Sequence, residues 1–283
     1  MNRASLTLLL TLSLFIVAPR EVLSGANTNN TSTKKSATEL AEEQFLQGKA
    51  YATGKGGDQS WEKAFHCYLK AAESGHTKAM VNLGLLYLEG KGTPKDEKMA
   101  YYWIHKASSL SDPRAIGLEG YLLCEGRGCM IAPSLGQPLL EKGASLGDPF
   151  SQAMLGERLL KSREKEPEAI AWLENAAGSG NGKACLLLGD FFMEKKTDKD
   201  RTIASGWYVK GAWLGHPGCQ YEYSRILLAS KGASSCYPWA KLSKERGVPA
   251  ANGIYWECCN ALSRQQRSMG EEEAENIRRL LPQ

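Results

Sequence analysis

The sequence contains little that would support chemistry or a membrane span. Its 283 residues include no HExxH, CxxC or G-x-x-x-x-G-K-[ST] pattern, so the usual zinc, redox and phosphate-loop signatures are missing. The longest apolar run, Leu6 to Ala18, is shorter than the roughly 20 residues that cross a bilayer. Basic residues are spread along the chain, which argues against nucleic acid as a partner. We therefore predict no catalytic residue, no cofactor and no metal.

The first 26 residues have the features of a signal peptide. Arg3 is followed by the apolar run, and Ser24 and Ala26 place small residues before a cleavage point at Asn27. We expect residues 1–26 to be removed and the mature chain to be exported, either periplasmic or secreted, with no membrane span. An uncleaved anchor is the alternative. Residues 27–37 are polar without periodicity, which predicts a flexible lead-in.

Two interlocked series of residues repeat along the chain. The first series runs at spacings of 36, 36, 36, 33 and 35, and the second lies nine residues ahead of each next member of the first. The first series is Gly48, Gly84, Gly120, Gly156, Gly189 and Ser224; the second is Gly75, Ser111, Gly147, Gly180, Gly215 and Gly247. A fixed period of this length indicates stacked structural repeats.

Each repeat is expected to form two helices. In the second unit, Leu83, Leu86 and Tyr87 fall at helical spacing, and a Gly-Lys-Gly turn at residues 90–92 ends that helix. A hairpin of this size cannot bury its own apolar face, so neighbouring hairpins must stack. The prediction is an all-α, right-handed α/α superhelical solenoid of about six helix-turn-helix repeats over residues 38–263, followed by a C-terminal cap.

The segment LGLLYLEGKGTPKDEKMAYYWIHKAS resembles a Sel-one-like repeat, a relative of the tetratricopeptide repeat. YATGKGGDQSWEKAFHCYLKAAESG and GWYVKGAWLG share the pattern of a Gly-X-Gly turn or an aromatic second helix. The resemblance covers roughly residues 40 to 262. It implies a non-catalytic scaffold that binds other proteins.

Three departures from the repeat pattern are visible. The third unit has Pro138 inside its second helix, for which we expect a late or bent helix. The fourth and fifth units replace the Gly-X-Gly turn with the charged segments LKSREKEPEA and MEKKTDKDR, which predicts differently shaped corners. Residues 264–283 place Ala274, Ile277 and Leu281 on one face, which favours a capping helix, with a partner-binding tail as the alternative.

Eight cysteines in an exported chain raise the question of disulfides. Cys124 and Cys129 flank one turn and could form a local bridge. Cys236 should approach the helix end that carries Cys258 and Cys259, and Cys259 is the partner we name. Cys67, Cys185 and Cys219 are expected to be buried thiols. The resemblance also points to a cysteine-rich branch of the family that acts on β-lactams, but the cysteine pairs that bridge each hairpin in that branch are absent here.

The concave face of the solenoid, lined by the first helix of each pair, is the predicted binding surface. Aromatic residues among charges suit recognition, and the register places seven such residues there: Tyr121, Phe150, Glu157, Lys183, Asp190, Tyr221 and Arg225. We expect an exported scaffold that binds a protein or peptide. The alternatives are a cell-wall or glycan ligand or a β-lactam-processing enzyme, and an endoplasmic-reticulum adaptor, although no Lys-Asp-Glu-Leu signal ends the chain.

Overall fold

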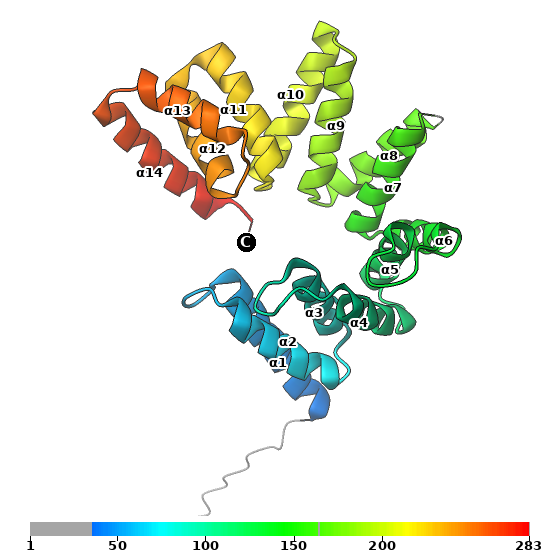
Figure 1. Ribbon diagram of the computed structural model, residues 1–283. Coiled ribbons are helices and arrows are strands. Elements are labelled where there is room, and N and C mark those ends of the chain that lie inside the picture. Colours follow the sequence, from blue (N-terminus) through cyan, green and yellow to red (C-terminus); the bar gives the residue numbers. More distant parts are fainter. Residues whose placement is uncertain (1–35, 164, 283) are drawn as a thin grey trace, which may run out of the picture. The chain divides into compact units, whose positions relative to one another are not determined.

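The structure is a computed structural model that describes residues 36–163 and 165–282, and those residues form helices joined by short corners (Figure 1). No strand occurs among them. The helices are α1 (Ala37–Thr53), α2 (Trp61–Glu73), α3 (Thr77–Glu89), α4 (Glu97–Ser109), α5 (Pro113–Glu125), α6 (Pro133–Ser145), α7 (Pro149–Ser162), α8 (Glu166–Gly178), α9 (Gly182–Glu194), α10 (Asp198–Trp213), α11 (Pro217–Lys231), α12 (Ala233–Glu245), α13 (Ala251–Ala261) and α14 (Arg264–Leu280). The predicted all-α solenoid of helix pairs is confirmed. The predicted signal peptide and most of the lead-in lie outside the described residues.

The second repeated series marks the corner between one helix pair and the next. Its residues adopt a left-handed backbone, as at Gly75 with φ 89° and at Ser111 with φ 65°. At the first five of these corners the next residue caps the following helix, as where Asp112 accepts from the amide of Ala115 at 2.9 Å. Left-handed residues end helices and polar side chains begin them, so two adjacent positions build each of these five corners.

The first repeated series allows the two helices of a pair to approach closely. A Cβ at Gly84 would lie 2.7 Å from Cγ1 of Ile104, and a Cβ at Gly156 would lie 2.6 Å from Cγ of Leu173. Only glycine leaves room for these second-helix side chains, which offsets its cost of about 1 kcal/mol relative to alanine inside a helix.

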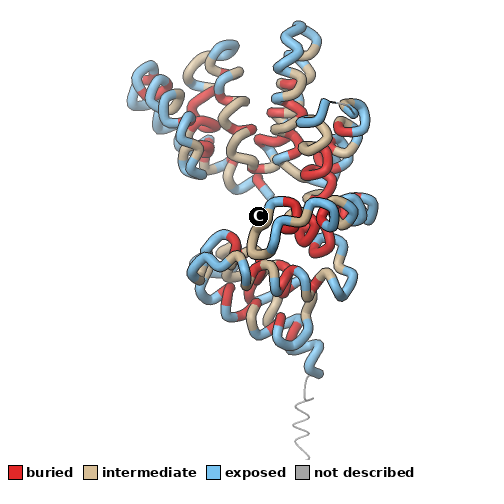
Figure 2. Tube along the Cα trace, turned by 45° about the vertical axis from the view of Figure 1, so that its right-hand side comes forward, coloured by how far each residue is buried: buried red, intermediate tan, exposed pale blue. Residues whose placement is uncertain are grey.

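Helix pairs stack in chain order, and their facing sides carry the buried residues (Figure 2). Beyond helices adjacent in sequence, contacts join α5 to α7, α7 to α9, α9 to α11, and α11 to α13. The odd-numbered helices over this stretch therefore form one layer. We call it the first-helix layer, and it carries the residues predicted for the binding face.

The third pair, α5 and α6, is packed backbone to backbone. A Cβ at Gly120 would lie 2.5 Å from the amide nitrogen of Leu140, and a Cβ at Gly136 would lie 2.5 Å from the carbonyl oxygen of Gly120. The expectation of a late helix was wrong: α6 begins at Pro133, which is 36 residues after the start of α4 at Glu97. Pro133 occupies the first helical position, where its missing N–H has no helical partner to lose.

The helix α14 covers the C-terminal end of the stack. It contacts α12, and Ala274, Ile277 and Leu281 are buried in that contact. The Tyr237 hydroxyl of α12 donates a hydrogen bond of 2.7 Å to Glu271 of α14. Within the described part of the chain, no helix is both long and apolar enough to cross a membrane.

Candidate functional site

The first-helix layer brings some of the predicted binding residues into contact. The rings of Tyr121 and Phe150 meet edge to face, with centroids 5.7 Å apart, across the α5–α7 contact. The Lys183 ammonium of α9 lies 2.6 Å from the Glu157 carboxylate of α7. On α11, the Arg225 guanidinium lies 5.9 Å from the Tyr221 ring centroid. The Tyr121–Phe150 and Lys183–Glu157 contacts cross from one helix to the next, whereas Tyr221 and Arg225 meet within α11.

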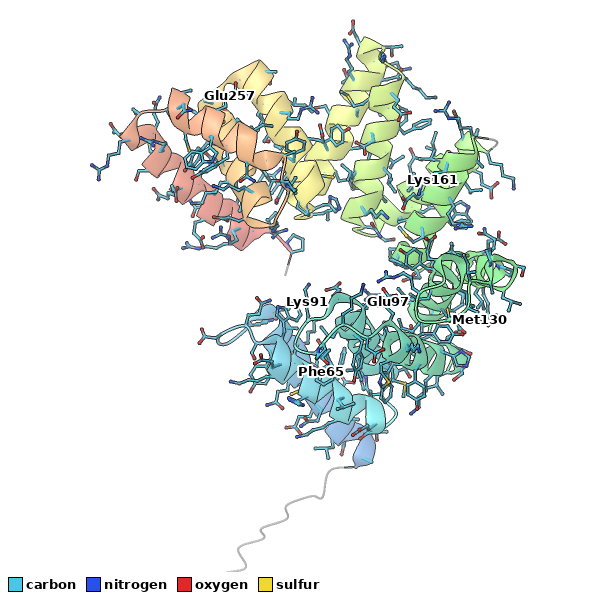
Figure 3. All side chains as sticks on the ribbon, in the orientation of Figure 1. Phe65, Lys91, Glu97, Met130, Lys161 and Glu257 are labelled. Atoms are coloured by element: carbon cyan, nitrogen blue, oxygen red, sulfur yellow. The ribbon has the colours of Figure 1, made fainter. Side chains whose placement is uncertain are left out.

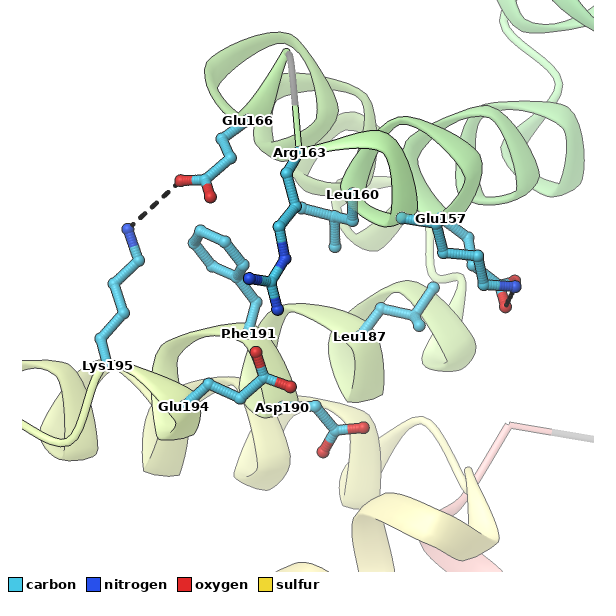
Figure 4. A pocket seen from close by; sticks show the side chains of 10 residues that line it. Glu157, Leu160, Arg163, Glu166, Leu187, Asp190, Phe191, Glu194 and Lys195 are labelled. Carbon is cyan, nitrogen blue, oxygen red and sulfur yellow. Dashed lines mark hydrogen bonds and ion pairs between the residues drawn. The ribbon is translucent and has the colours of Figure 1, made fainter.

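Two adjoining pockets open on this layer and share Glu157 and Lys161. The first lies between α7 and α9, has a volume of about 570 Å³, and is shown in Figure 4. The second has a volume of about 590 Å³ and extends to Tyr121 of α5. Leu160, Leu187 and Phe191 supply apolar surface in the first pocket. Together the pockets offer a continuous surface from α5 to α9.

Glu157 carries the negative charge at the junction of the two pockets. Burial would raise the pKa of its carboxyl, but hydrogen bonds from Lys183 and Lys161 outweigh that effect and hold the pKa below its usual value. Glu157 is therefore ionised at neutral pH and positions both ammonium groups beside the pockets.

Asp190 lines the first pocket, yet it also serves the fold. Its carboxylate accepts a 2.8 Å hydrogen bond from the hydroxyl of Tyr208, whose side chain is buried on α10. Burial and the nearby charge of Glu194 raise the pKa of Asp190, and the hydrogen bond from Tyr208 acts in the opposite direction. A substitution at Asp190 therefore changes the packing of α9 on α10 as well as the pocket.

Arg163 and Glu194 bring unpaired charges to the first pocket. Neither side chain makes a hydrogen bond or ion pair among the described residues, and the Arg163 guanidinium points into the pocket (Figure 4). Arg163 ends α7 in a left-handed conformation, with φ 57°. The other ions of the pocket are satisfied: Lys195 lies 3.6 Å from Glu166, and Lys161 lies 3.1 Å from Glu157.

Arg163, Phe191 and Glu194 line the first pocket but are not among the binding residues predicted from the sequence. The signal was available, because the charged segment LKSREKEPEA replaces the Gly-X-Gly turn at this corner. Residues 126–128 hold that turn in the preceding repeat. In the fourth repeat this turn is absent, and the end of α7 lies beside the pocket.

Two histidines cap helices, and a third contacts a carboxylate on the next helix. His76 and His216 accept from the amides of Ala79 at 3.1 Å and Cys219 at 3.4 Å. Burial, with the positive charges of Lys183 and Arg246, lowers the pKa of His216, which keeps its ring neutral and able to accept. His105 lies 2.6 Å from Glu119. No group of three His, Cys, Asp or Glu residues in the described ranges could hold a metal ion.

The cysteine expectations need two corrections. All eight cysteines are free thiols, and Cys129 donates towards the carbonyl oxygen of Leu122, 3.5 Å away, so it does not bridge to Cys124. Cys236 meets Cys258, with sulfurs 3.0 Å apart, instead of Cys259. Adjacent helical residues point about 100° apart, so only one of the two can face Cys236. Cys67, Cys185 and Cys219 are buried.

Comparison with known proteins identifies the repeat. The Sel1 repeat family model matches residues 40–76, 77–112 and 149–181. Among solved structures, a Sel1 repeat protein from Oxalobacter formigenes is 28% identical, with a TM-score of 0.55, over 75% of this chain and 88% of that one. The immunity protein Pa5087 from Pseudomonas aeruginosa is 23% identical, with a TM-score of 0.55, over 77% of this chain and 81% of that one, and shares the fold. No curated protein matches the chain.

Sel1 repeats generally form non-catalytic scaffolds for protein interaction. The matched segments coincide with α1 to α4 and with α7 to α8, where the sequence register and the packing glycines recur. The chain therefore carries Sel1 repeats and is a Sel1-type α solenoid.

Proposed function

We propose that the chain is an exported scaffold that binds a segment of another protein along the concave, first-helix layer. The two adjoining pockets between α5 and α9 are the anchor point. The observation that carries this proposal is the pair of unpaired charges, Arg163 and Glu194, beside the exposed part of Phe191.

The chemistry of the first pocket suits a polypeptide. An apolar residue of the partner would cover Leu160, Leu187 and Phe191, because a few anchor residues that fill pockets supply most of the binding energy of an interface. A partner carboxylate would pair with Arg163, and a donor or a basic side chain would pair with Glu194. Arg163 and Glu194 are both exposed to solvent while the site is empty, so the free protein does not bury an unpaired ion. A partner residue of opposite charge would pair with each of them on binding.

A matched pair of substitutions tests the pocket. Peptides selected from a displayed random library on the native chain are measured against Arg163→Asn and Lys196→Asn. Both residues are exposed and left-handed, with φ 57° and 61°, and asparagine tolerates that conformation, but only Arg163 lines the pocket. Losing a charge-assisted bond should weaken binding by roughly 10- to 100-fold for Arg163→Asn alone.

Two outcomes would oppose the pocket assignment. Equal binding by both variants would place the partner elsewhere. Loss of binding in both variants would show that removing a basic residue from either corner weakens binding, whether or not that residue lines the pocket. Glu194→Gln is a further variant that keeps the shape of the side chain while removing its charge, and it should favour a different subset of the selected peptides.

Export needs its own measurement. The run from Leu6 to Ala18 and the small residues before Asn27 support a cleaved signal peptide. The chain expressed in its host should be recovered outside the cytoplasm with Asn27 at its N-terminus, as determined by N-terminal sequencing. Recovery of the intact N-terminus in the cytoplasm would refute export and leave the pocket assignment untouched.

A further inference from the structure

Two buried thiols meet between α12 and α13. The sulfurs of Cys236 and Cys258 are 3.0 Å apart, and both residues are fully buried. A disulfide bond needs sulfurs at about 2.05 Å, so an approach of about 1 Å would join them. All eight cysteines lie in the described part of the chain, and Cys236 and Cys258 are the pair whose thiols hydrogen-bond to each other.

The other cysteines have different neighbours. Cys129 faces the carbonyl oxygen of Leu122 at 3.5 Å, and Cys219 faces the carbonyl oxygen of Gly182 at 3.6 Å. A Cβ at Gly136 would lie 2.7 Å from the sulfur of Cys124, so that thiol fills the space between α5 and α6. These thiols are engaged with backbone, which distinguishes them from the pair at α12 and α13.

The position of the pair is where a repeat array needs support. Each repeat is held by its neighbours, so the last units open most readily. The helix α13 has 11 residues, and no side chain caps its N-terminus at Ala250. On its far side, α12 is held by α14 through Tyr237 and Glu271, and by the ion pair between Lys241 and Glu271. A covalent link from α12 would therefore anchor a short helix near the end of the array that has no side-chain N-cap.

We propose that Cys236 and Cys258 form a disulfide bond that locks α13 onto α12. The two thiols lose two protons and two electrons to make one S–S bond, and a donor disulfide of the glutathione class is reduced to two thiols. The bond closes a loop across 22 positions of sequence. Such links stabilise mainly by restricting the unfolded chain.

The bond forms while the chain folds. Burial raises the pKa of both thiols, although the contact with Cys236 acts in the opposite direction on Cys258. Thiolates are the reacting species, so exchange is slow once the helices have closed over the pair. The same burial then protects the finished bond from reduction.

Refolding in a redox buffer tests the bond directly. The chain is reduced and unfolded, then refolded with reduced and oxidised glutathione, and its free thiols are alkylated and counted by mass spectrometry in denaturant. Six of the eight cysteines should be alkylated, and digestion should yield one linked peptide pair that contains Cys236 and Cys258. Eight alkylated cysteines, or a bond through Cys259 instead, would overturn the proposal.

Adjacent cysteines supply the matched control. Cys258→Ala should leave all seven remaining thiols free, whereas Cys259→Ala should leave five, since the bond survives. Hydrogen exchange of the α13 amides should be slower in the oxidised chain than in the reduced chain, while α3 amides should exchange equally in both. Equal exchange at α13 would show that the bond does not lock the helix. None of these results bears on peptide binding at α7 and α9.

Discussion

The corners of the third and fourth repeats carry an arginine at the same repeat position, but only one of the two arginines is paired among the described residues. Arg127 and Arg163 lie 36 residues apart, after α5 and at the end of α7. Arg127 donates two hydrogen bonds, of 3.1 and 2.9 Å, to Glu97 at the start of α4, which is labelled in Figure 3. The residue 36 positions after Glu97 is Pro133, which offers no carboxylate, and Arg163 is unpaired.

The difference shows how a repeat array changes the pairing of a charge at one corner without changing its fold. Where the Gly-X-Gly turn is kept, its middle residue holds the preceding repeat: Lys91 lies 4.7 Å from the ring centroid of Trp61, and Arg127 binds Glu97. At the fourth corner, where the turn is lost, Arg163 has no partner among the described residues and lines a pocket. The third corner therefore ties two repeats together, whereas the fourth corner leaves an exposed charge without a partner among the described residues.

Gly128→Ala, in the third corner, should cause the largest loss in the free energy of unfolding. Gly128 has φ 73°, and a Cβ there would overlap the carbonyl oxygen of Glu97. The left-handed backbone costs about 1–2 kcal/mol for alanine, and the overlap adds about 1–3 kcal/mol. Chemical denaturation should report the combined loss. Gly57→Ala is the control, because nothing lies within 4 Å of that position and its φ is not positive, so a comparable loss there would remove the argument.

Asp190→Ala and Glu194→Ala should distinguish a pocket residue that supports the fold from one that does not. Asp190→Ala leaves the buried hydroxyl of Tyr208 without its acceptor, which costs about 1–3 kcal/mol. Glu194→Ala removes an acid that has no bonded partner and should change stability by less than about 0.5 kcal/mol. If urea denaturation gave the two variants equal stability, Asp190 would be as free as Glu194 and would return to the set of binding residues.

The sequence predicted the repeats and helices because they depend on local chemistry. Left-handed glycines, capping residues such as Asp112, and packing glycines such as Gly84 act within a few residues of the chain or at a fixed register. Pro138 predicts a late start for α6, but Pro133 stands at the first helical position and starts the helix in register.

The candidate site could be predicted only in part. The register placed Glu157 and Lys183 on one layer, but whether a charge is paired depends on the neighbouring repeat. Asp190 was expected to serve binding, and its hydrogen bond to Tyr208 joins residues 18 positions apart on different helices. The charged segment LKSREKEPEA marks a changed corner, but it does not show whether Arg163 is paired, because pairing depends on the residue that the neighbouring repeat offers.

Arg127→Ala and Arg163→Ala compare the two arginines directly. Arg127→Ala removes an ion pair near the surface, which should lower the melting temperature by about 1–3 °C. Arg163→Ala removes no bonded partner, and alanine and arginine share the strain of the left-handed backbone, so its melting temperature should stay close to that of the native chain. Differential scanning calorimetry at low salt checks both. An equal shift in the two variants would show that the corners do not differ.

Asp190→Asn should have the smallest effect, visible as a dependence on pH. The pKa of Asp190 is raised by burial and by the charge of Glu194, so its folded pKa exceeds the unfolded value near 3.9. An acid whose pKa is higher in the folded state contributes stability at a pH below its unfolded pKa. That contribution is lost as the pH rises through the folded pKa. Asparagine keeps an acceptor for Tyr208 without the charge, so the variant should gain stability relative to the native chain at pH 7. That advantage should shrink as the pH falls towards about 4. Urea midpoints measured from pH 4 to 7 decide the matter, because a difference that stays constant over this range would mean that the charge of Asp190 is as well solvated in the folded chain as in the unfolded one.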